Sequence, residues 1–188
     1  MLNRLPNLLT ISRILASLLT AVLLLLESDA SRLAALLVFA AAGLTDWLDG
    51  WLARRLGAGS ALGKMLDPIA DKLLLVAAML PLASSDNWDW VLLVPAICIL
   101  MRELLVSGLR EQLANSHGNG ASLPVSLLAK WKTTIQLIAL GGLILAPLAP
   151  AQLPLHTVAV VLFWFAAGIT LKTGLDYLNQ SIHHVSAK

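Results

Sequence analysis

The chain has 188 residues, of which 58% are hydrophobic and 13% charged, and its formal net charge is +2. A soluble domain is roughly 45–50% apolar, and the mean hydropathy here is +0.81. These values exclude a water-soluble globule, a disordered chain and a basic nucleic-acid-binding protein, and a single cysteine excludes an intrachain disulfide scaffold. The sequence therefore predicts an integral membrane protein, with room for about six spans of about 20 residues.

Six apolar stretches approach the length of a membrane crossing: residues 8–26, 33–52, 65–83, 90–113, 126–148 and 153–178. We expect six transmembrane helices, because a helix satisfies its own backbone hydrogen bonds within lipid. Residues 1–7, with Arg4 and Pro6, are predicted to form a short interfacial segment. The residues after 178 are predicted to be a short tail, so that residues 1–188 make one all-α membrane domain.

Basic residues mark one side of this predicted domain. Of the 13 Lys and Arg residues, only Arg32 falls in a segment on the other side, which instead receives Glu27, Asp29, Asp86 and Asp89. Short loops rich in Lys and Arg stay in the cytoplasm. Both termini are therefore predicted to be cytoplasmic.

Four aspartates sit in or beside the second and third apolar stretches, namely Asp46, Asp49, Asp67 and Asp71. An ionised Asp at the centre of a membrane helix costs about 2.5–3.5 kcal/mol, so something must neutralise them. Residues three and four apart share a helix face, and if the two helices pack as a hairpin the four carboxylates converge. Such oxygen ligands would hold two divalent cations, Mg²⁺ or Mn²⁺, as in phosphoryl transfer.

Small residues accompany the aspartates at helical spacing. Gly50 and Ala53 lie four and seven residues after Asp46, and Gly63 lies four before Asp67, so each would leave space for a bulky ligand on the aspartate face. The alternative is that the aspartates are helix-end charges that reach the interface or pair with neighbouring bases. Four carboxylates at paired spacing favour the metal site.

Residues 46–71 read D-W-L-D-G-W-L-A-R-R-L-G-A-G-S-A-L-G-K-M-L-D-P-I-A-D. This segment resembles the signature of the CDP-alcohol phosphatidyltransferase family, in which D-x2-D-G-x2-A-R is followed after eight residues by G-x3-D-x3-D, and every defined position is met. Residues 5–13, 101–111 and 125–134 are similar to the bacterial branch of that family that uses glycerol 3-phosphate.

The resemblance implies a six-helix enzyme of the bacterial inner membrane, usually a homodimer, with its site facing the cytoplasm. It would transfer the phosphatidyl group of CDP-diacylglycerol to glycerol 3-phosphate, giving phosphatidylglycerophosphate and CMP. The four aspartates match the metal ligands, and Asp71 also matches the general base that deprotonates the attacking hydroxyl. The positions that match or line the CDP-diacylglycerol site are Asn7, Thr10, Gly50, Ala53, Arg54, Ser60 and Gly63.

Glycerol 3-phosphate carries about two negative charges, so its site needs basic donors. The predicted donors are Arg102, Arg110, Lys130 and Lys132. Arg102 lies inside an apolar run, where an unpaired guanidinium would be costly. The alternative for Arg102 is a buried pair with Glu103 or a neighbouring carboxylate, and cytoplasmic sorting alone could explain the two lysines.

Other functions remain open from the sequence. The aspartate signature does not separate glycerol 3-phosphate from inositol phosphate, serine or phosphatidylglycerol as the acceptor. Intramembrane carboxylates also mark ion pathways, so a cation transporter or channel is the alternative from a different class. That alternative predicts transport without dependence on a nucleotide.

Overall fold

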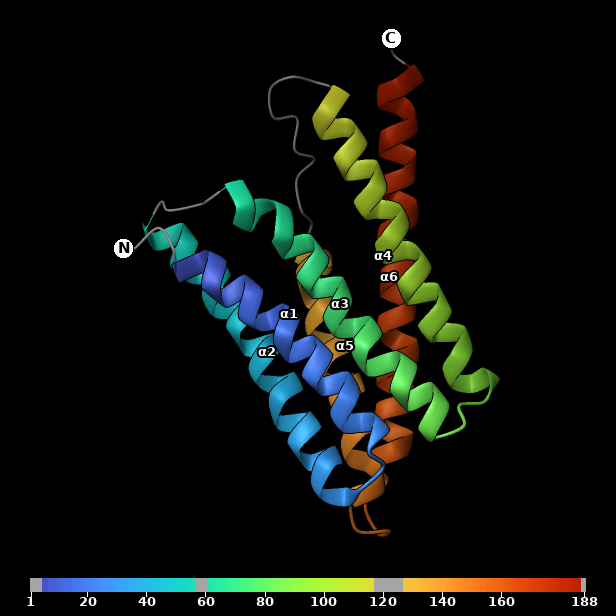
Figure 1. Cartoon of the computed structure of the whole chain (residues 1–188). Coiled ribbons are helices and arrows are strands. Elements are labelled where there is room, and N and C mark those ends of the chain that lie inside the picture. Colours follow the sequence, from blue (N-terminus) through green and yellow to red (C-terminus); the bar gives the residue numbers. More distant parts are fainter. Residues whose placement is uncertain (1–4, 57–60, 117–126, 187–188) are drawn as a thin grey trace.

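The computed structural model describes residues 5–56, 61–116 and 127–186, with side chains described for 8–45, 66–111 and 131–179 (Figure 1). Over these residues the chain is helical and contains no strand. The elements in chain order are α1 (Leu5–Leu25), α2 (Asp29–Leu56), α3 (Ala61–Ser85), α4 (Trp90–Ser116), α5 (Leu127–Leu145), the 3₁₀ turn η2 (Ala146–Leu148) and α6 (Leu155–Ser186).

The prediction of six long helices is confirmed, with changes at their ends. Helix α1 already begins at Leu5, so residues 5–7 belong to it and do not form a separate interfacial segment; residues 1–4 lie outside the described part. Helix α5 gives way to the 3₁₀ turn at Ala146, where Pro147 cannot continue an α-helical hydrogen-bond ladder. Helix α6 begins directly after Pro154 and runs on to Ser186, well past the predicted end at residue 178.

Helix α1 is polar inside and apolar outside. Its buried residues are Thr10, Arg13, Ser17, Thr20 and Leu24, whereas its exposed large side chains are leucine, isoleucine and valine. Ser17 and Thr20 donate to backbone carbonyls one turn earlier, at 2.8 Å each. A water-soluble helix has the opposite pattern, so the exposed face of α1 is one that meets lipid.

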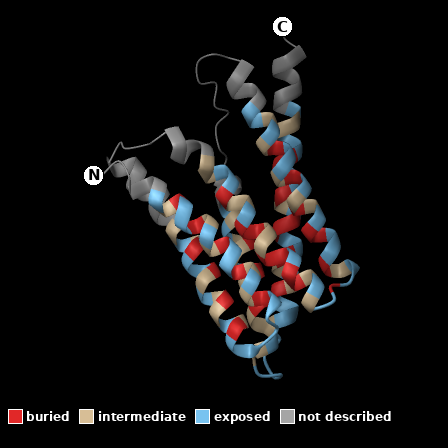
Figure 2. Cartoon of the chain, viewed as in Figure 1, coloured by how far each residue is buried: buried red, intermediate tan, exposed pale blue. Residues whose placement is uncertain are grey.

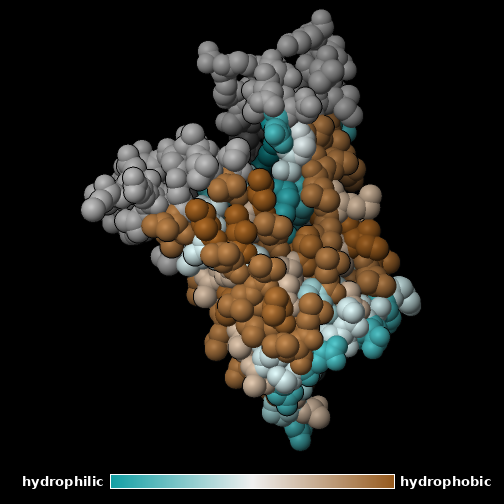
Figure 3. All heavy atoms as spheres, viewed as in Figure 1, coloured by the Kyte–Doolittle hydropathy of each residue, from teal (hydrophilic) through white to brown (hydrophobic). Residues whose placement is uncertain are grey.

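Within the described residues, four helices are long and apolar enough to cross a membrane, over residues 8–25 of α1, 90–111 of α4, 131–148 of α5 and η2, and 155–179 of α6. The chain is thus a multi-pass membrane protein. Helices α2 and α3 have 28 and 25 residues, about 40 Å each at 1.5 Å per residue. Both contain charged residues, among them Arg32 of α2 and Asp67, Asp71 and Lys72 of α3. Apolar side chains cover most of the visible surface (Figure 3).

The six helices pack as two groups of three. Helix α1 packs along both α2 and α3, while α6 packs along both α4 and α5. Contacts between the groups are fewer and run mainly through α2 with α5 and α3 with α4. Because α1 lies between α2 and α3, these two helices make few direct contacts over the described residues, so the direct hairpin considered from the sequence is not the main packing.

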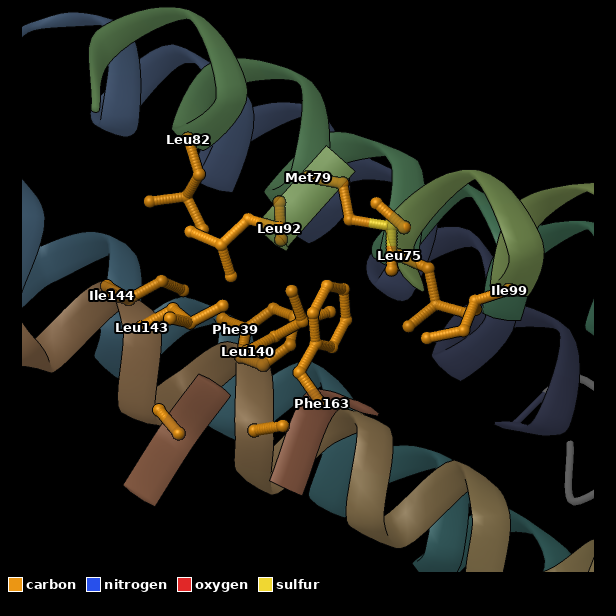
Figure 4. Close-up of a cluster of buried hydrophobic side chains, with 14 of the residues drawn as sticks. Phe39, Leu75, Met79, Leu82, Leu92, Ile99, Leu140, Leu143, Ile144 and Phe163 are labelled. Atoms are coloured by element: carbon orange, nitrogen blue, oxygen red, sulfur yellow. The ribbon is translucent and has the colours of Figure 1, made fainter. Parts of the chain in front are cut away.

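One apolar core joins the two groups. Phe39 of α2, Met79 of α3, Leu140 of α5 and Phe163 of α6 converge in it, with side chains from every helix (Figure 4). Phe163 also meets the ring of Trp88 edge-on, with 5.9 Å between ring centroids. Buried residues lie along the inside of the bundle, and exposed ones face outward (Figure 2).

An ion pair ties α2 to α3 at one end of the bundle. Arg32 donates from Nη2 to Oδ1 of Asp86 at 2.6 Å and from Nη1 to Oδ2 at 3.1 Å. The hydrogen bond to Asp86 raises the pKa of Arg32 above its ordinary value. This bidentate pair lies at the opposite end of α3 from Asp67 and Asp71, and it is therefore separate from the aspartate site.

Candidate functional site

Two of the predicted acidic residues, Asp67 and Asp71, lie one turn apart near the start of α3. Each is bonded to a residue of α1. Thr10 donates its hydroxyl to Oδ1 of Asp67 at 2.7 Å, and Arg13 donates from Nη1 to Oδ1 of Asp71 at 3.1 Å. Since Thr10 and Arg13 are three apart and the aspartates four apart, one face of α1 meets one face of α3 through both pairs.

The second pair is asymmetric in its exposure. The Arg13 side chain is 0% exposed, whereas that of Asp71 is 45% exposed. A guanidinium buried among helices needs a carboxylate partner, and Asp71 supplies one while its own side chain still reaches the surface. Asp71 is therefore anchored and accessible at once, as a group that acts on a ligand must be.

The donor chemistry of this site fits a divalent cation. A carboxylate has about four lone-pair positions, so it can accept a hydrogen bond and bind a metal ion at once, and oxygen ligands suit Mg²⁺ and Mn²⁺. Among the side chains that the structure describes, no group of three His, Cys, Asp or Glu residues gathers in one place. Two of the four predicted ligands, Asp46 and Asp49, lie outside those side chains.

Several other predicted site residues also lie outside the described side chains. They are Asn7, Gly50, Ala53, Arg54, Ser60 and Gly63, predicted for CDP-diacylglycerol, and Lys130, predicted for the acceptor. Thr10, predicted near the nucleotide, is described, and its hydroxyl contacts Asp67. The structure therefore brings Thr10 and Asp67 together, which the sequence did not predict.

A second polar cluster joins α4, α5 and α6. Glu103 of α4 accepts hydrogen bonds from Lys132 Nζ of α5 and, at 3.3 Å, from Arg102 Nη1. Arg102 also donates from Nη2 to Oγ1 of Thr173 of α6 at 3.0 Å. The side chains of Arg102 and Lys132 are 8% exposed and that of Glu103 is 17% exposed. Two buried cations thus share one carboxylate, which leaves the cluster an excess of positive charge.

The structure confirms that Arg102 contacts Glu103, which was the alternative to a phosphate site. The pair does not satisfy every hydrogen-bond donor of Arg102, because the buried Nε of Arg102 has no hydrogen-bond partner among the described residues. A buried guanidinium N–H without a partner costs free energy. The pair with Glu103 therefore leaves one donor of Arg102 unsatisfied among the described residues.

Two further basic residues lie near this cluster. Arg110, two turns beyond Arg102 on α4, stacks over the ring of Tyr177 with its Cζ 5.1 Å from the ring centroid. Lys72 of α3 donates to the carbonyl of Pro68, one turn earlier on the same helix, at 2.7 Å.

The surface is hollowed between the two groups. In the upper half of the space-filling view, hydrophilic atoms lie in a recess between two apolar faces (Figure 3). In the ribbon view, α3 and α4 diverge toward this same end, where α1 begins and α6 ends (Figure 1). The face seen in Figure 3 thus carries a hydrophilic recess between apolar surfaces.

The sequence matches the CDP-alcohol phosphatidyltransferase family over residues 3–171, which is most of the chain. The chain belongs to the CDP-alcohol phosphatidyltransferase family. Among its curated relatives is a Rickettsia typhi protein, 41% identical over 95% of this chain and 97% of the relative. A Shigella flexneri protein is 37% identical over 94% of this chain and 93% of its own length. A Haemophilus influenzae protein is 36% identical over 93% of this chain and 91% of its own length. All three bear the name "CDP-diacylglycerol--glycerol-3-phosphate 3-phosphatidyltransferase".

For a CDP-alcohol phosphatidyltransferase, the residues that sequence reasoning missed are informative. Arg13 was counted only as a cytoplasmic charge, and Thr173 was not considered. A signal was present for Arg13, since it lies within the first apolar run and on the same helix face as Thr10. No comparable signal marks Thr173, because a threonine in a membrane helix commonly bonds its own backbone.

Proposed function

We propose that the chain transfers the phosphatidyl group of CDP-diacylglycerol to glycerol 3-phosphate, releasing CMP. The observation that carries the proposal is the pair of α1–α3 contacts that holds Asp67 and Asp71 of the family signature beside each other. The name shared by relatives that match over nearly the whole chain supports this donor and acceptor.

In the proposed reaction, Asp71 accepts the proton of the 1-hydroxyl of glycerol 3-phosphate. The hydroxyl oxygen forms a bond to the β-phosphorus of CDP-diacylglycerol, and the bond from that phosphorus to the CMP oxygen breaks, so that CMP leaves with the electron pair. Arg13 holds Asp71 through Oδ1 and offsets its charge. This arrangement orients the base, because a bonded carboxylate keeps one direction toward the substrate.

We propose that Asp46, Asp49, Asp67 and Asp71 hold two divalent cations, Mg²⁺ or Mn²⁺. When bound, the cations supply charge stabilisation for the pyrophosphate and the transferring phosphoryl group. Thr10 positions Asp67 for this role through its hydroxyl. Asn7, Gly50, Ala53, Arg54, Ser60 and Gly63 are proposed to line the site for the CDP part.

We propose that Arg102 and Lys132, with Arg110 and Lys130, bind the phosphate of the acceptor. The excess of buried positive charge around Glu103 and the unpartnered Nε of Arg102 support a dianionic ligand. The acceptor's phosphate would thus bind on α4 and α5 while its hydroxyl meets the base on α3.

A panel of acceptors tests this proposal. Purified protein in detergent, given CDP-diacylglycerol and Mg²⁺, should release CMP with glycerol 3-phosphate and much more slowly with serine, inositol phosphate or phosphatidylglycerol. Release with another member of the panel instead would assign that acceptor. If no alcohol supports CMP release, the enzyme assignment is wrong, and cation flux into proteoliposomes would then support a transporter.

We also propose that all six helices cross the bacterial inner membrane, with both termini and the site in the cytoplasm. The distribution of basic residues supports this orientation. In a Cys98→Ser background, a cysteine placed at Asn87 should react with an impermeant maleimide from outside intact cells, and one at Ala187 should not. The reverse labelling would overturn the orientation. A homodimer is proposed from the family resemblance and can be tested by cross-linking in membranes.

A further inference from the structure

We propose that Thr173 and Gly174 of α6 are positioning residues for Arg102, and that through it they set the affinity for the phosphate of the acceptor. The inference rests on the proposed function, in which Arg102 binds that phosphate. It concerns two residues that contact neither the aspartates nor Lys132 in the described contacts, and it gives α6 a part in acceptor binding.

Gly174 supplies the space in which the Arg102 side chain lies. A Cβ atom added at Gly174 would lie 2.8 Å from Cγ of Arg102, 3.3 Å from Nε and 3.6 Å from Cδ. Carbon atoms in contact are about 3.5–4.0 Å apart, so any side chain at position 174 would displace the stem of Arg102. That stem cannot swing aside freely, because Arg102 is 8% exposed and packed between α4 and α6.

Thr173 fixes the far end of the same side chain. The single hydrogen of its hydroxyl lies within reach of the carbonyls of Ile169 and Thr170, with oxygen–oxygen distances of 2.9 and 3.0 Å, and the hydroxyl oxygen accepts from Nη2 of Arg102 at 3.0 Å. Because the donor of the hydroxyl is engaged by the backbone, its lone pairs face the guanidinium. Thr173 therefore holds Arg102 in one orientation and takes no proton or ligand itself.

Glu103 bonds the other terminal nitrogen, Nη1, at 3.3 Å. The guanidinium is thus held by α4 on one side and by α6 on the other, and only Nε lacks a partner among the described residues. An arginine binds a phosphate best when its planar group is already oriented. Positions 173 and 174 provide this orientation before the acceptor arrives.

The test compares Gly174→Ala with Gly168→Ala. Gly168 lies on the same helix, and a Cβ there would have no atom within 4 Å. Both variants therefore gain the same helix propensity, but only the methyl group of Gly174→Ala would contact Arg102. We expect Gly174→Ala to raise the KM for glycerol 3-phosphate about tenfold, the equivalent of one hydrogen bond to a charged group. The KM for CDP-diacylglycerol should stay within about twofold of the unmodified protein in both variants.

A second pair of variants keeps the test independent of overpacking. Thr173→Val keeps the branched shape of the side chain but removes the hydroxyl, and it should raise the KM for glycerol 3-phosphate about three- to tenfold. Thr173→Ser keeps the hydroxyl, so its KM for glycerol 3-phosphate should match that of the unmodified protein. Calorimetric titration of glycerol 3-phosphate into the CMP-bound protein should show the same order of affinities without turnover.

A purely structural role would lower kcat through loss of folded protein and leave both KM values unchanged. That result, or Gly174→Ala behaving like Gly168→Ala, would overturn the inference. Absence of CMP release with glycerol 3-phosphate in the unmodified protein would instead overturn the proposed function, so the two failures are distinguishable.

Discussion

Arg13 and Asp71, 58 residues apart in sequence, form an ion pair between α1 and α3 with 3.1 Å between Nη1 and Oδ1. The arginine belongs to the inner face of the bundle, and the aspartate belongs to the family signature. The contact adds Arg13 to the residues of α1 that meet the aspartate site, of which the sequence had suggested only Asn7 and Thr10. Helix α1 thus supports the site as well as crossing the membrane.

Arg13→Gln should lower kcat about 10- to 100-fold, the usual cost of removing a group that orients a metal-binding residue. The physical reason is that Asp71 loses the charge and the hydrogen bond that fix its direction. CMP release in detergent measures the effect. Arg32→Gln is the matched control, because it breaks the ion pair with Asp86 at the other end of α3. Equal losses in the two variants would show that Arg13 acts only on stability.

Thr10→Val should raise the Mn²⁺ concentration needed for half-maximal activity by about tenfold, because Asp67 loses the hydroxyl that orients it. Thr10→Ser should behave like the unmodified protein. Thr20→Val is the control, since Thr20 lies on the same helix but donates to the carbonyl of Ala16. If Thr10→Val instead raises only the KM for CDP-diacylglycerol, Thr10 contacts the nucleotide, as the family resemblance implies.

Glu103→Gln should destabilise the free protein by about 1–3 kcal/mol, because Arg102 and Lys132 lose the charge that they share. This corresponds to a fall in Tm of several degrees for a chain of this length. Glycerol 3-phosphate should raise the Tm of this variant by more than it raises that of the unmodified protein, since a bound dianion replaces the lost charge. Scanning calorimetry gives both values. Glu111→Gln, at an exposed position on α4, should change neither, and an unchanged Tm in Glu103→Gln would contradict the buried cluster.

Asp71→Asn should abolish CMP release while CDP-diacylglycerol still binds, because the amide keeps the shape of the side chain but accepts no proton. Removal of divalent cations with EDTA should also abolish release, and added Mg²⁺ or Mn²⁺ should restore it in the unmodified protein only. Binding is measured by equilibrium dialysis with a short-chain CDP-diacylglycerol. Retained turnover in Asp71→Asn would exclude it as the base.

The number and order of the helices could be predicted from the apolar runs, because a membrane span needs a length and hydropathy that residues such as 8–25 and 155–179 meet directly. The packing partners of each helix could not be predicted from these runs. Leucines on the lipid face of α1, such as Leu15 and Leu18, are as apolar as those in the core, so hydropathy does not separate the two faces in a bilayer. The buried polar residues of α1 carry that information, and Arg13 is the clearest of them.

The residues of the candidate site were predictable by type and only partly by contact. Spacing placed Asp67 and Asp71 on one helix face, and the cost of a buried charge singled out Arg102. Their partners come from distant helices: Thr10, Arg13 and Thr173 each lie more than 50 residues away from the side chain they hold. A single sequence contains no signal for such pairs except the polarity of the residues themselves.

The division of the bundle into two groups of three helices has a consequence for how acceptors can change. Under the proposed function, α1, α2 and α3 carry the nucleotide-lipid chemistry, whereas α4, α5 and α6 bind the alcohol's phosphate. One apolar core joins the two groups, but direct helix contacts between the groups are fewer than those within them. We therefore expect a new alcohol specificity to need changes mainly in α4, α5 and α6, at residues outside the shared core.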